Sequence, residues 1–228
     1  MYHCKFLLFD LDGTLTDPKE GVFKCIDYAF SELGLPAPSL SQLEGCIGPP
    51  LHAMLSQLIS EVKQSLSDQE VLHWVDSAAD LYRDRYSKEG LFENSVYPGI
   101  VPCLQRLQEA GKQLFVATSK PQVFAEKILH RFDLFRFFKG VYGISLTARS
   151  PDKSELISEL LQKEEILGKQ SVMIGDRKFD ILGGRQNQTY TIGVSWGHGT
   201  RQELLQAGAD VICDLPQDLV SLWVRHSA

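Results

Sequence analysis

The sequence predicts an α/β protein that consists of a doubly wound parallel sheet and an inserted all-helical domain. Two observations lead to this fold class. Short apolar runs alternate with helix-length segments in the second half of the chain, and about a hundred residues separate the first apolar run from the second. The chain has 228 residues, of which 43% are hydrophobic and 23% charged, so it has the composition of a globular protein and enough length for both parts.

Five short runs rich in Val, Ile, Leu and Phe are expected to form buried parallel strands. These runs are residues 5–9, 114–117, 141–144, 172–174 and 191–194, and a weaker run at 211–213 is expected at the edge of the sheet. Helix-length segments at 122–130, 154–163 and 180–187 separate the later runs, as in a doubly wound sheet. Shorter helices are expected after Thr200 and at residues 218–224.

The segment between the first two runs is too long for a crossover, which needs only about a dozen residues. Its pattern is helical. Residues 21–33 are amphipathic, residues 51–62 have apolar positions at helical spacing, and Ser67-x-x-Glu70 is a capping box that begins a long helix. A Tyr-Pro-Gly turn at 97–99 then returns the chain to a helix at 100–110. We therefore expect a core catalytic domain of residues 1–15 and 94–228 and a helical cap domain of residues 16–93.

The charge and cysteine content exclude several classes of protein. Lys+Arg number 23 and Asp+Glu 29, a net charge of −6 without a basic run, so no nucleic acid partner is expected. The five cysteines are scattered without a C-x-x-C pair, which disfavours a disulfide framework or structural zinc. The sequence has neither a signal h-region nor a transmembrane-length apolar run, so we expect a cytoplasmic protein without a membrane partner.

Polar residues follow the apolar runs at the positions where a parallel sheet binds its ligands, beyond the carboxyl ends of the strands. Asp10 and Asp12 follow the first run, and Thr118-Ser119-Lys120 follow the second. Gly175-Asp176 follows the fourth run, with Asp180 four residues later, and Lys153 lies a short loop after the third.

Asp10 and Asp12 are expected on the same face if the strand geometry continues that far, since strand side chains alternate. Repulsion would then raise the pKa of one carboxyl, which a bound cation or a required protonated state would offset. Oxygen donors from Asp10, Asp12 and Asp176 favour Mg²⁺ over Zn²⁺. This arrangement suits phosphoryl transfer.

Three residues, Gly13, Thr14 and Thr118, favour a phosphate site. Gly13 permits a sharp departure from the strand, and Thr14 adds a hydroxyl near the phosphate. Thr118 lies just before a helix that Pro121 begins, where free N–H groups favour an anion. Taken singly, Asp10 and Asp12 could be turn formers, and Thr118 or Asp180 could be helix caps. Their occurrence together at four strand ends favours a functional site.

The order D-x-D-G-T-L, strand Thr, Lys, G-D-x-x-x-D over residues 9–180 resembles the haloacid dehalogenase superfamily, whose core is Rossmann-like. The helical insert follows the first motif, as in members with the smaller helical cap. Residues 47–51 (IGPPL), 97–100 (YPGI) and 175–177 (GDR) resemble the phosphoglycolate phosphatase-like subgroup in particular.

The resemblance implies that Asp10 attacks phosphorus to form an aspartyl-phosphate and that Asp12 is the general acid and base. Mg²⁺ would bind the Asp10 carboxylate, the Asp12 carbonyl and the Asp176 carboxylate, and Asp180 would orient this shell. The residues expected to contact the substrate phosphate are Thr14, Thr118, Ser119 and Lys153. Lys153 lacks the commoner following proline, so Arg149 or Lys120 could share its role.

The function implied is Mg²⁺-dependent hydrolysis of a small phosphorylated metabolite such as 2-phosphoglycolate, by a monomer or homodimer. Three alternatives stay open: a nucleoside 5'-monophosphate or pyrophosphate hydrolase, a sugar-phosphate mutase, and a non-catalytic phosphate-binding protein. A dehalogenase is disfavoured, because halide displacement needs neither Mg²⁺ nor Asp12. The loop at 47–51 is either a tight turn or a substrate-specificity loop.

Overall fold

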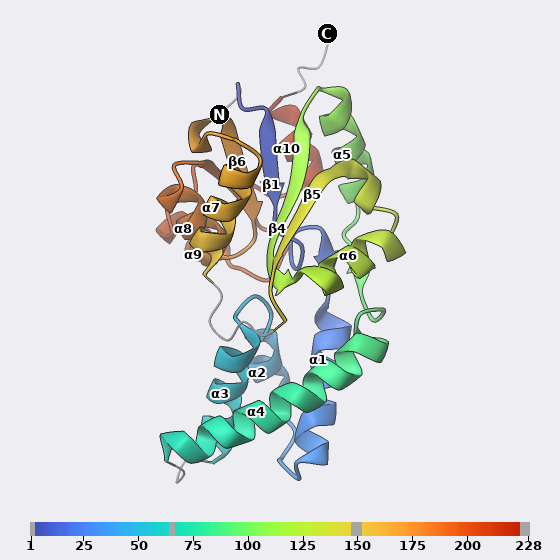
Figure 1. Cartoon of the computed structure of the whole chain (residues 1–228), viewed down its shortest axis with the longest axis vertical. Helices are drawn as coiled ribbons and strands as arrows, with labels where there is room; N and C mark the ends of the chain where they lie inside the picture. Colours follow the sequence, from blue (N-terminus) through green and yellow to red (C-terminus); the bar gives the residue numbers. More distant parts are fainter. Residues whose placement is uncertain (1–2, 64–66, 147–151, 224–228) are drawn as a thin grey trace. The chain divides into compact units, whose positions relative to one another are not determined.

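The chain contains a six-stranded parallel sheet with the strand order β5-β4-β1-β6-β7-β8 (Figure 1). We describe it from a computed structural model, which covers residues 3–63, 67–146 and 152–223. The strands are β1 (Phe6–Phe9), β4 (Gln113–Pro121), β5 (Phe138–Ile144), β6 (Ser171–Gly175), β7 (Tyr190–Val194) and β8 (Val211–Cys213). Each predicted apolar run overlaps one of these strands, and the predicted doubly wound α/β core is confirmed.

The central strand β1 pairs in parallel with β4 on one side and β6 on the other. Phe9 lies opposite Val116 and Ile174, and the Asp10 N–H still donates to the Ile174 carbonyl at 2.9 Å. The chain runs outward from β1 through β4 to β5 and then returns to β6. Such a reversal of strand order opens a crevice at the carboxyl ends of the strands.

Helices cover both faces of the sheet. In Figure 1, α5 (Ile100–Glu109) and α6 (Gln122–Arg131) lie on one side of the strands, and α7 (Lys153–Lys163) and α8 (Lys178–Gln186) lie on the other. Two shorter helices, α9 (Arg201–Gln206) and α10 (Pro216–Ser221), precede and follow β8. The single-turn helices are η2 (Phe135–Phe137) and η3 (Gly168–Gln170).

The core between the sheet and α7 is apolar and buried. The side chains that meet there are Leu8, Phe115, Ala117, Ile157, Leu160, Leu161, Ile166 and Met173. Each large apolar side chain that is fully buried contributes roughly 1.5–3 kcal/mol to the free energy of unfolding. This layer fixes α7, and therefore its first residue Lys153, against the central strands.

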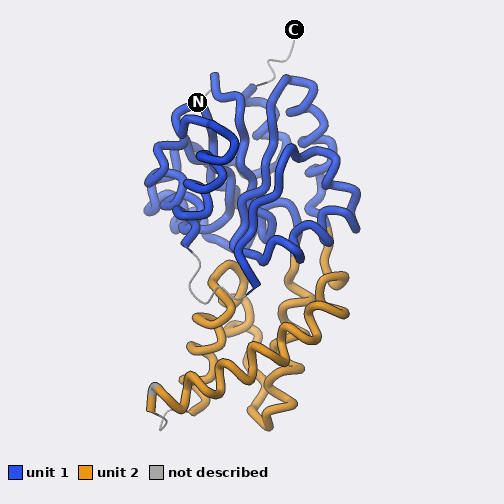
Figure 2. The backbone as a smooth tube through the Cα atoms, viewed as in Figure 1, with its two compact units in different colours: residues 1–17, 96–146, 151–228 blue, residues 18–95, 147–150 orange. Residues whose placement is uncertain are grey.

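The chain divides into two compact units (Figure 2). The core unit contains the described residues up to 17, residues 96–146 and the described residues from 152 onward. The helical unit contains the described residues from 18 to 95. At the two crossings, β2 (Thr16–Asp17) pairs with β3 (Ser95–Val96). The sequence indicated boundaries after residues 15 and 93, and the assignment of the helical unit as a cap stays a prediction.

The helical unit is built from α1 (Lys19–Glu32), α2 (Leu40–Glu44), α3 (Leu51–Val62), α4 (Asp68–Arg85) and the π-helical turn η1 (Tyr86–Gly90). The predicted capping box is present, because the Ser67 hydroxyl accepts from the Glu70 N–H and the Glu70 carboxylate accepts from the Ser67 N–H. Next to η1, the Gly21 N–H donates to the Glu93 carbonyl at 2.9 Å. A Cβ on Gly21 would overlap the Gly90 carbonyl, so this approach requires glycine.

Several elements differ from the expectations. The strand expected at 114–117 continues to Pro121, because its pairing with β5 shifts register after Thr118 and then resumes. The helix expected at 218–224 begins at Pro216 and ends at Ser221. Helix α2 was not expected, since its five residues are too few for a helical pattern to be visible.

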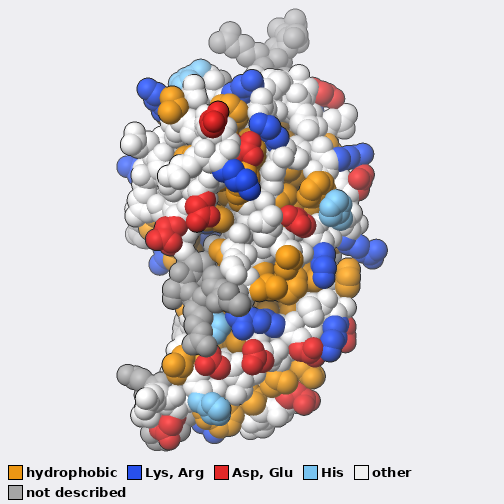
Figure 3. Space-filling view, viewed as in Figure 1, with side chains coloured by type: hydrophobic (Ala, Val, Ile, Leu, Met, Phe, Trp, Pro, Cys, Tyr) orange, Lys and Arg blue, Asp and Glu red, His pale blue; other side chains and the backbone are white. Residues whose placement is uncertain are grey.

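The surface carries both signs of charge. Lys, Arg, Asp and Glu side chains are interspersed on the face shown in Figure 3. The five cysteines are free thiols with buried side chains. Within the described part of the chain, no helix has the length and apolarity needed to cross a bilayer.

Candidate active site

The residues singled out at the strand ends lie together in the core unit. Asp10 directly follows β1, Asp176 directly follows β6, and Thr118 lies within β4. Lys153 is the first residue of α7, and Asp180 lies in the first turn of α8. All five side chains are buried, which is unusual for Asp and Lys unless they are paired.

The Lys153 side chain contacts the carboxylates of both Asp10 and Asp180. Its Nζ lies 2.7 Å from Asp10 Oδ1 and 2.8 Å from Asp180 Oδ1. Carboxylate oxygens of Asp10, Asp176 and Asp180 lie within 4.8 Å of one another. The carboxyl ends of two strands and the starts of two helices therefore meet in one acidic cluster, which consists of Asp10, Asp176 and Asp180.

The pKa values in the acidic cluster reflect its burial and its charge. Burial alone would lower the pKa of Lys153, but the Asp10 and Asp180 carboxylates outweigh burial and raise it. Burial raises the pKa of Asp180 to about 6, against the attraction of Lys153. Burial, followed by the charges of Asp180 and Asp10, raises the pKa of Asp176 well above its ordinary value. The cluster thus holds more negative charge than one lysine neutralises.

This donor set fits a hard divalent cation. Three carboxylates face one ammonium group, and all the candidate ligand atoms of the cluster are oxygens. Oxygen-only sites of this kind suit Mg²⁺, whereas Zn²⁺ favours sites with His or Cys. Burial and the neighbouring carboxylates raise the pKa of Asp176. A cation bound beside it would stabilise its ionised form and offset that rise.

Asp12 has a different partner from Asp10. Its Oδ2 lies 2.7 Å from the Nζ of Lys120, whose side chain is 7% exposed. Burial raises the pKa of Asp12, and the Lys120 ammonium opposes that shift. Lys120 therefore contacts Asp12, whereas Lys153 contacts Asp10 and Asp180. Arg149, the other residue considered for the role of Lys153, lies outside the described residues.

Asp176 is held by the segment after β1 and by the loop after β7. The Thr14 hydroxyl donates to Asp176 Oδ1 at 3.4 Å, and the His198 N–H donates to Oδ2 at 2.8 Å. Gly13 has a φ of +85°, and a Cβ at that position would overlap the Asp176 carboxylate. The structure thus directs the Thr14 hydroxyl, which we expected near the phosphate, to Asp176.

The loop at residues 196–199 forms part of the site. The sequence indicated a loop there, and a site-closing role for His198 was only the weaker interpretation. The Trp196 indole donates to the Thr14 carbonyl at 3.0 Å, and a Cβ on Gly197 or Gly199 would overlap Asp176. The His198 Nε2 also lies 3.3 Å from Asp17 Oδ1. The available signal was the pair of glycines just after a strand whose carboxyl end points to the same edge.

Thr118 and Ser119 lie in the last part of β4. The Thr118 hydroxyl accepts from the Lys120 N–H at 3.2 Å and is buried, and Ser119 beside it is half-buried. Helix α6 begins directly after Pro121. The loop at 47–51 belongs to the helical unit, and both interpretations of it stay predictions.

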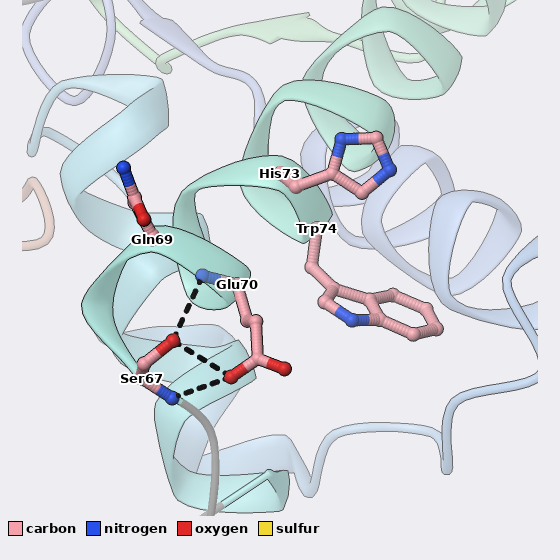
Figure 4. Close-up of a pocket in the computed structure, with 5 residues that line it drawn as sticks. All are labelled: Ser67, Gln69, Glu70, His73 and Trp74. Carbon is pink, nitrogen blue, oxygen red and sulfur yellow. Dashed lines mark hydrogen bonds between the residues drawn. The ribbon is translucent and has the colours of Figure 1, made fainter.

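A concave region of about 420 Å³ lies elsewhere, at the start of α4 (Figure 4). It is lined by Ser67, Gln69, Glu70, His73 and Trp74, none of which the sequence singled out for chemistry. Two of its polar residues cap the start of the helix, since Glu70 Oε2 accepts from both the N–H and the hydroxyl of Ser67. The acidic cluster, and not this concavity, is the candidate site.

Comparisons with known proteins agree with this geometry. The family model described as haloacid dehalogenase-like hydrolase matches residues 7–194. A 5'-nucleotidase of Pseudomonas aeruginosa is 42% identical over 198 residues, 87% of this chain and 86% of that protein. A phosphoglycolate phosphatase of Vibrio cholerae is 29% identical, covering 94% of each chain. The crystal structure of a predicted phosphatase from Clostridium acetobutylicum, 35% identical, has a TM-score of 0.86 and covers 96% of this chain and 97% of its own. The chain therefore belongs to the haloacid dehalogenase-like hydrolases and is a phosphatase of that family.

Proposed function

We propose that this phosphatase is a Mg²⁺-dependent phosphate monoester hydrolase that forms an aspartyl-phosphate on Asp10. The observation that carries the proposal is the Asp10–Lys153 contact of 2.7 Å at the carboxyl end of the central strand. The ammonium group contacts and directs one Asp10 oxygen, which leaves the other available for attack. The Asp12 carboxylate two residues later would transfer the protons.

The reaction proceeds in two halves. An Asp10 oxygen forms a bond to phosphorus while the bond from phosphorus to the ester oxygen breaks, and Asp12 gives a proton to the departing oxygen. Asp12 then takes a proton from a water molecule whose oxygen attacks phosphorus. The Asp10–phosphorus bond breaks, which releases inorganic phosphate and restores both carboxyl groups.

The remaining residues hold the phosphate and its charge. Lys153, Thr118 and Ser119 donate to the phosphate oxygens, and their positions are fixed by α7 and β4. Asp10, Asp176 and the Asp12 carbonyl would hold Mg²⁺, and Asp180 would orient Lys153 and the ligands. When bound, the cation neutralises negative charge on the transferred phosphoryl group. The acidic cluster supports this assignment, because its three carboxyl groups outnumber the ammonium group of Lys153, and a cation would balance the remaining negative charge.

Two substrate classes are favoured by particular relatives. The 42% identity to a 5'-nucleotidase favours a nucleoside 5'-monophosphate. The match to a phosphoglycolate phosphatase over 94% of both chains favours 2-phosphoglycolate, the substrate that the sequence motifs indicated. We place the nucleotide first because the identity is higher at similar coverage, and both remain small phosphate monoesters.

The test is release of inorganic phosphate with and without Mg²⁺. The substrates are p-nitrophenyl phosphate, nucleoside 5'-monophosphates, 2-phosphoglycolate, a sugar phosphate and pyrophosphate, compared by kcat/KM. Asp10→Asn should lose on the order of 10³-fold or more of the activity, because it removes the nucleophile. Asp133→Asn is the matched control, since Asp133 is exposed and has a positive φ of 55° that Asn also adopts. Retained activity in Asp10→Asn would contradict the mechanism.

A further inference from the structure

The partly buried ion pair between Lys120 and Asp12 gives the two oxygens of Asp12 different surroundings. Oδ2 lies 2.7 Å from Lys120 Nζ. Oδ1 is buried and has no hydrogen-bond partner among the residues that the structure describes. A buried polar atom without a partner costs roughly 1–3 kcal/mol, and a catalytic role is one of the recognised reasons for keeping such an atom.

We propose that Lys120 is a positioning residue that holds the Asp12 carboxylate so that Oδ1 transfers the proton to and from the reacting oxygens. This inference rests on the proposed function, in which Asp12 is the general acid and base. It assigns to Lys120 a role distinct from that of Lys153, which contacts Asp10 and Asp180 instead.

The backbone around Lys120 supports a positioning role. The N–H of Lys120 donates to the Thr118 hydroxyl at 3.2 Å. On the neighbouring strand β5, Gly143 leaves room for the chain, because a Cβ there would lie 2.6 Å from the Lys120 carbonyl oxygen. The register shift between Thr118 and Pro121 lies at this point. Contacts with Thr118 and with Gly143 thus hold the backbone of Lys120, from which the side chain extends to Asp12.

The charge of Lys120 selects which oxygen of Asp12 reacts. An ammonium contact at 2.7 Å occupies Oδ2 and fixes the torsion of the carboxyl group. Without the contact, the carboxyl group can rotate about its last bond, whose torsion is broad. The loss would appear as a poorly aligned proton transfer. In the first half of the reaction it would slow only esters whose leaving group requires a proton, whereas in the second half it would slow the attack of water equally for every ester.

The experiment compares esters that need a proton with one that does not. Ethyl phosphate and 2-phosphoglycolate release poor alkoxide leaving groups, whereas p-nitrophenyl phosphate releases a stable phenolate. For Lys120→Met, we expect kcat/KM, which reports the steps up to formation of the aspartyl-phosphate, to fall by ~10-fold or more on both alkyl esters and by less than ~3-fold on p-nitrophenyl phosphate. Lys120→Arg, which keeps a charged donor, should recover part of the loss.

Two controls separate positioning from other roles. Lys139→Met on β5 makes the same change at an exposed lysine paired with Glu164, and it should leave all three rates unchanged. A double variant with Asp12→Asn and Lys120→Met should be no slower on the alkyl esters than Asp12→Asn alone, because both changes affect one proton transfer.

Each other outcome contradicts the inference. Equal losses of kcat/KM on all three esters would show a general structural role, and a loss of kcat/KM confined to 2-phosphoglycolate would show that Lys120 binds the substrate carboxylate. Unchanged rates would show that Asp12 needs no positioning. If Lys120→Met does not fold by circular dichroism, Lys120→Gln must give the selective loss instead. A wild-type chain that hydrolyses none of the esters contradicts the proposed function itself, whereas active wild type without the selective loss contradicts only this inference.

Discussion

At the scale of single residues, the acidic cluster is organised by Lys153, which bridges Asp10 and Asp180 with contacts of 2.7 and 2.8 Å. Asp180 also caps the start of its helix, since its Oδ2 accepts from the Arg177 N–H at 3.1 Å. One carboxylate therefore both fixes α8 and balances the lysine that holds Asp10. Removing its charge without removing its oxygen separates these two roles.

Asp180→Asn keeps an oxygen that accepts from Arg177 but no longer attracts Lys153 as an anion. We expect the Mg²⁺ concentration for half-maximal activity to rise by ~10- to 100-fold, because loss of residues that support metal ligands usually weakens metal affinity by this factor. The measurement is phosphate release against Mg²⁺ concentration, with Asp133→Asn as the control. An unchanged Mg²⁺ requirement would show that Asp180 serves only the helix.

Gly13→Ala tests the approach of the backbone to Asp176. A left-handed φ costs a non-glycine residue roughly 1–2 kcal/mol, and at Gly13 the new Cβ would also overlap the Asp176 carboxylate. Gly34→Ala is the matched control, because Gly34 has a φ of +65° with open space around it. We expect Gly13→Ala to lower both the free energy of unfolding and kcat, and Gly34→Ala to lower only the former. Equal activities in the two variants would show that Asp176 tolerates displacement.

The sequence predicted which of these residues lie at the strand ends, but it did not predict which partners their side chains contact. Asp10 and Asp176 directly follow apolar runs, so the rule for strand ends is sufficient to bring them to one edge. The partner of Thr14 depends on the path of the chain through Gly13, and the partner of Lys120 depends on how far β4 continues. Neither property has a local sequence pattern. The catalytic roles of these residues stay predictions.

At the scale of elements, long helices with clear periodicity were predicted closely, and short or irregular ones were not. Helix α3 has the bounds that its pattern indicated, at residues 51–62. Helix α4 begins after the predicted capping box at Ser67. The π-helical turn at Tyr86–Gly90 was not predicted, because it has no periodic pattern in the sequence; Gly90 at its end packs closely against Gly21.

The end of α4 is tied to the chain before β3 by an ion pair with a testable pH dependence. Arg85 Nη1 lies 2.8 Å from Glu93 Oε2, and Lys24 Nζ lies 3.0 Å from Glu93 Oε1. Hydrogen bonds from Arg85, and then those from Lys24, hold the pKa of Glu93 below its ordinary value of 4.5. A lowered pKa in the folded state stabilises the protein above the unfolded-state pKa, and this stabilisation disappears as the pH falls through the folded-state value.

Glu93→Gln should therefore be less stable than wild type near neutral pH, and the difference should shrink below about pH 4.5. The measurement is the free energy of urea-induced unfolding of both proteins from about pH 6 to about pH 3. Comparison with wild type at each pH removes the effect of other carboxyl groups. A difference that stays constant over this range would mean that the charge of Glu93 does not contribute.

At the scale of the whole molecule, the chain leaves the core unit after Asp17 and returns at Val96. The insertion was visible in the sequence because the gap between two apolar runs far exceeded the length of a crossover. The parallel order of the sheet followed from the alternation of runs and helices, which leaves few other topologies. The pairing of β2 with β3 at the two crossings was not predicted, because each strand has only two residues.

Binding of Mg²⁺ should stabilise the whole fold, because the acidic cluster brings together parts of the chain that are far apart in sequence. Its residues follow the ends of β1 and β6 and lie in the first turn of α8. At a Mg²⁺ concentration of about 100 times its dissociation constant, the free energy of unfolding should rise by about 2.7 kcal/mol. For a chain of this size, each kcal/mol corresponds to roughly 2–4 °C in Tm. Thermal unfolding with and without Mg²⁺ gives this shift without any substrate. Asp176→Asn should lose most of the shift and Asp133→Asn should keep it, because only Asp176 belongs to the cluster. The same shift in both variants would place the bound Mg²⁺ away from the acidic cluster.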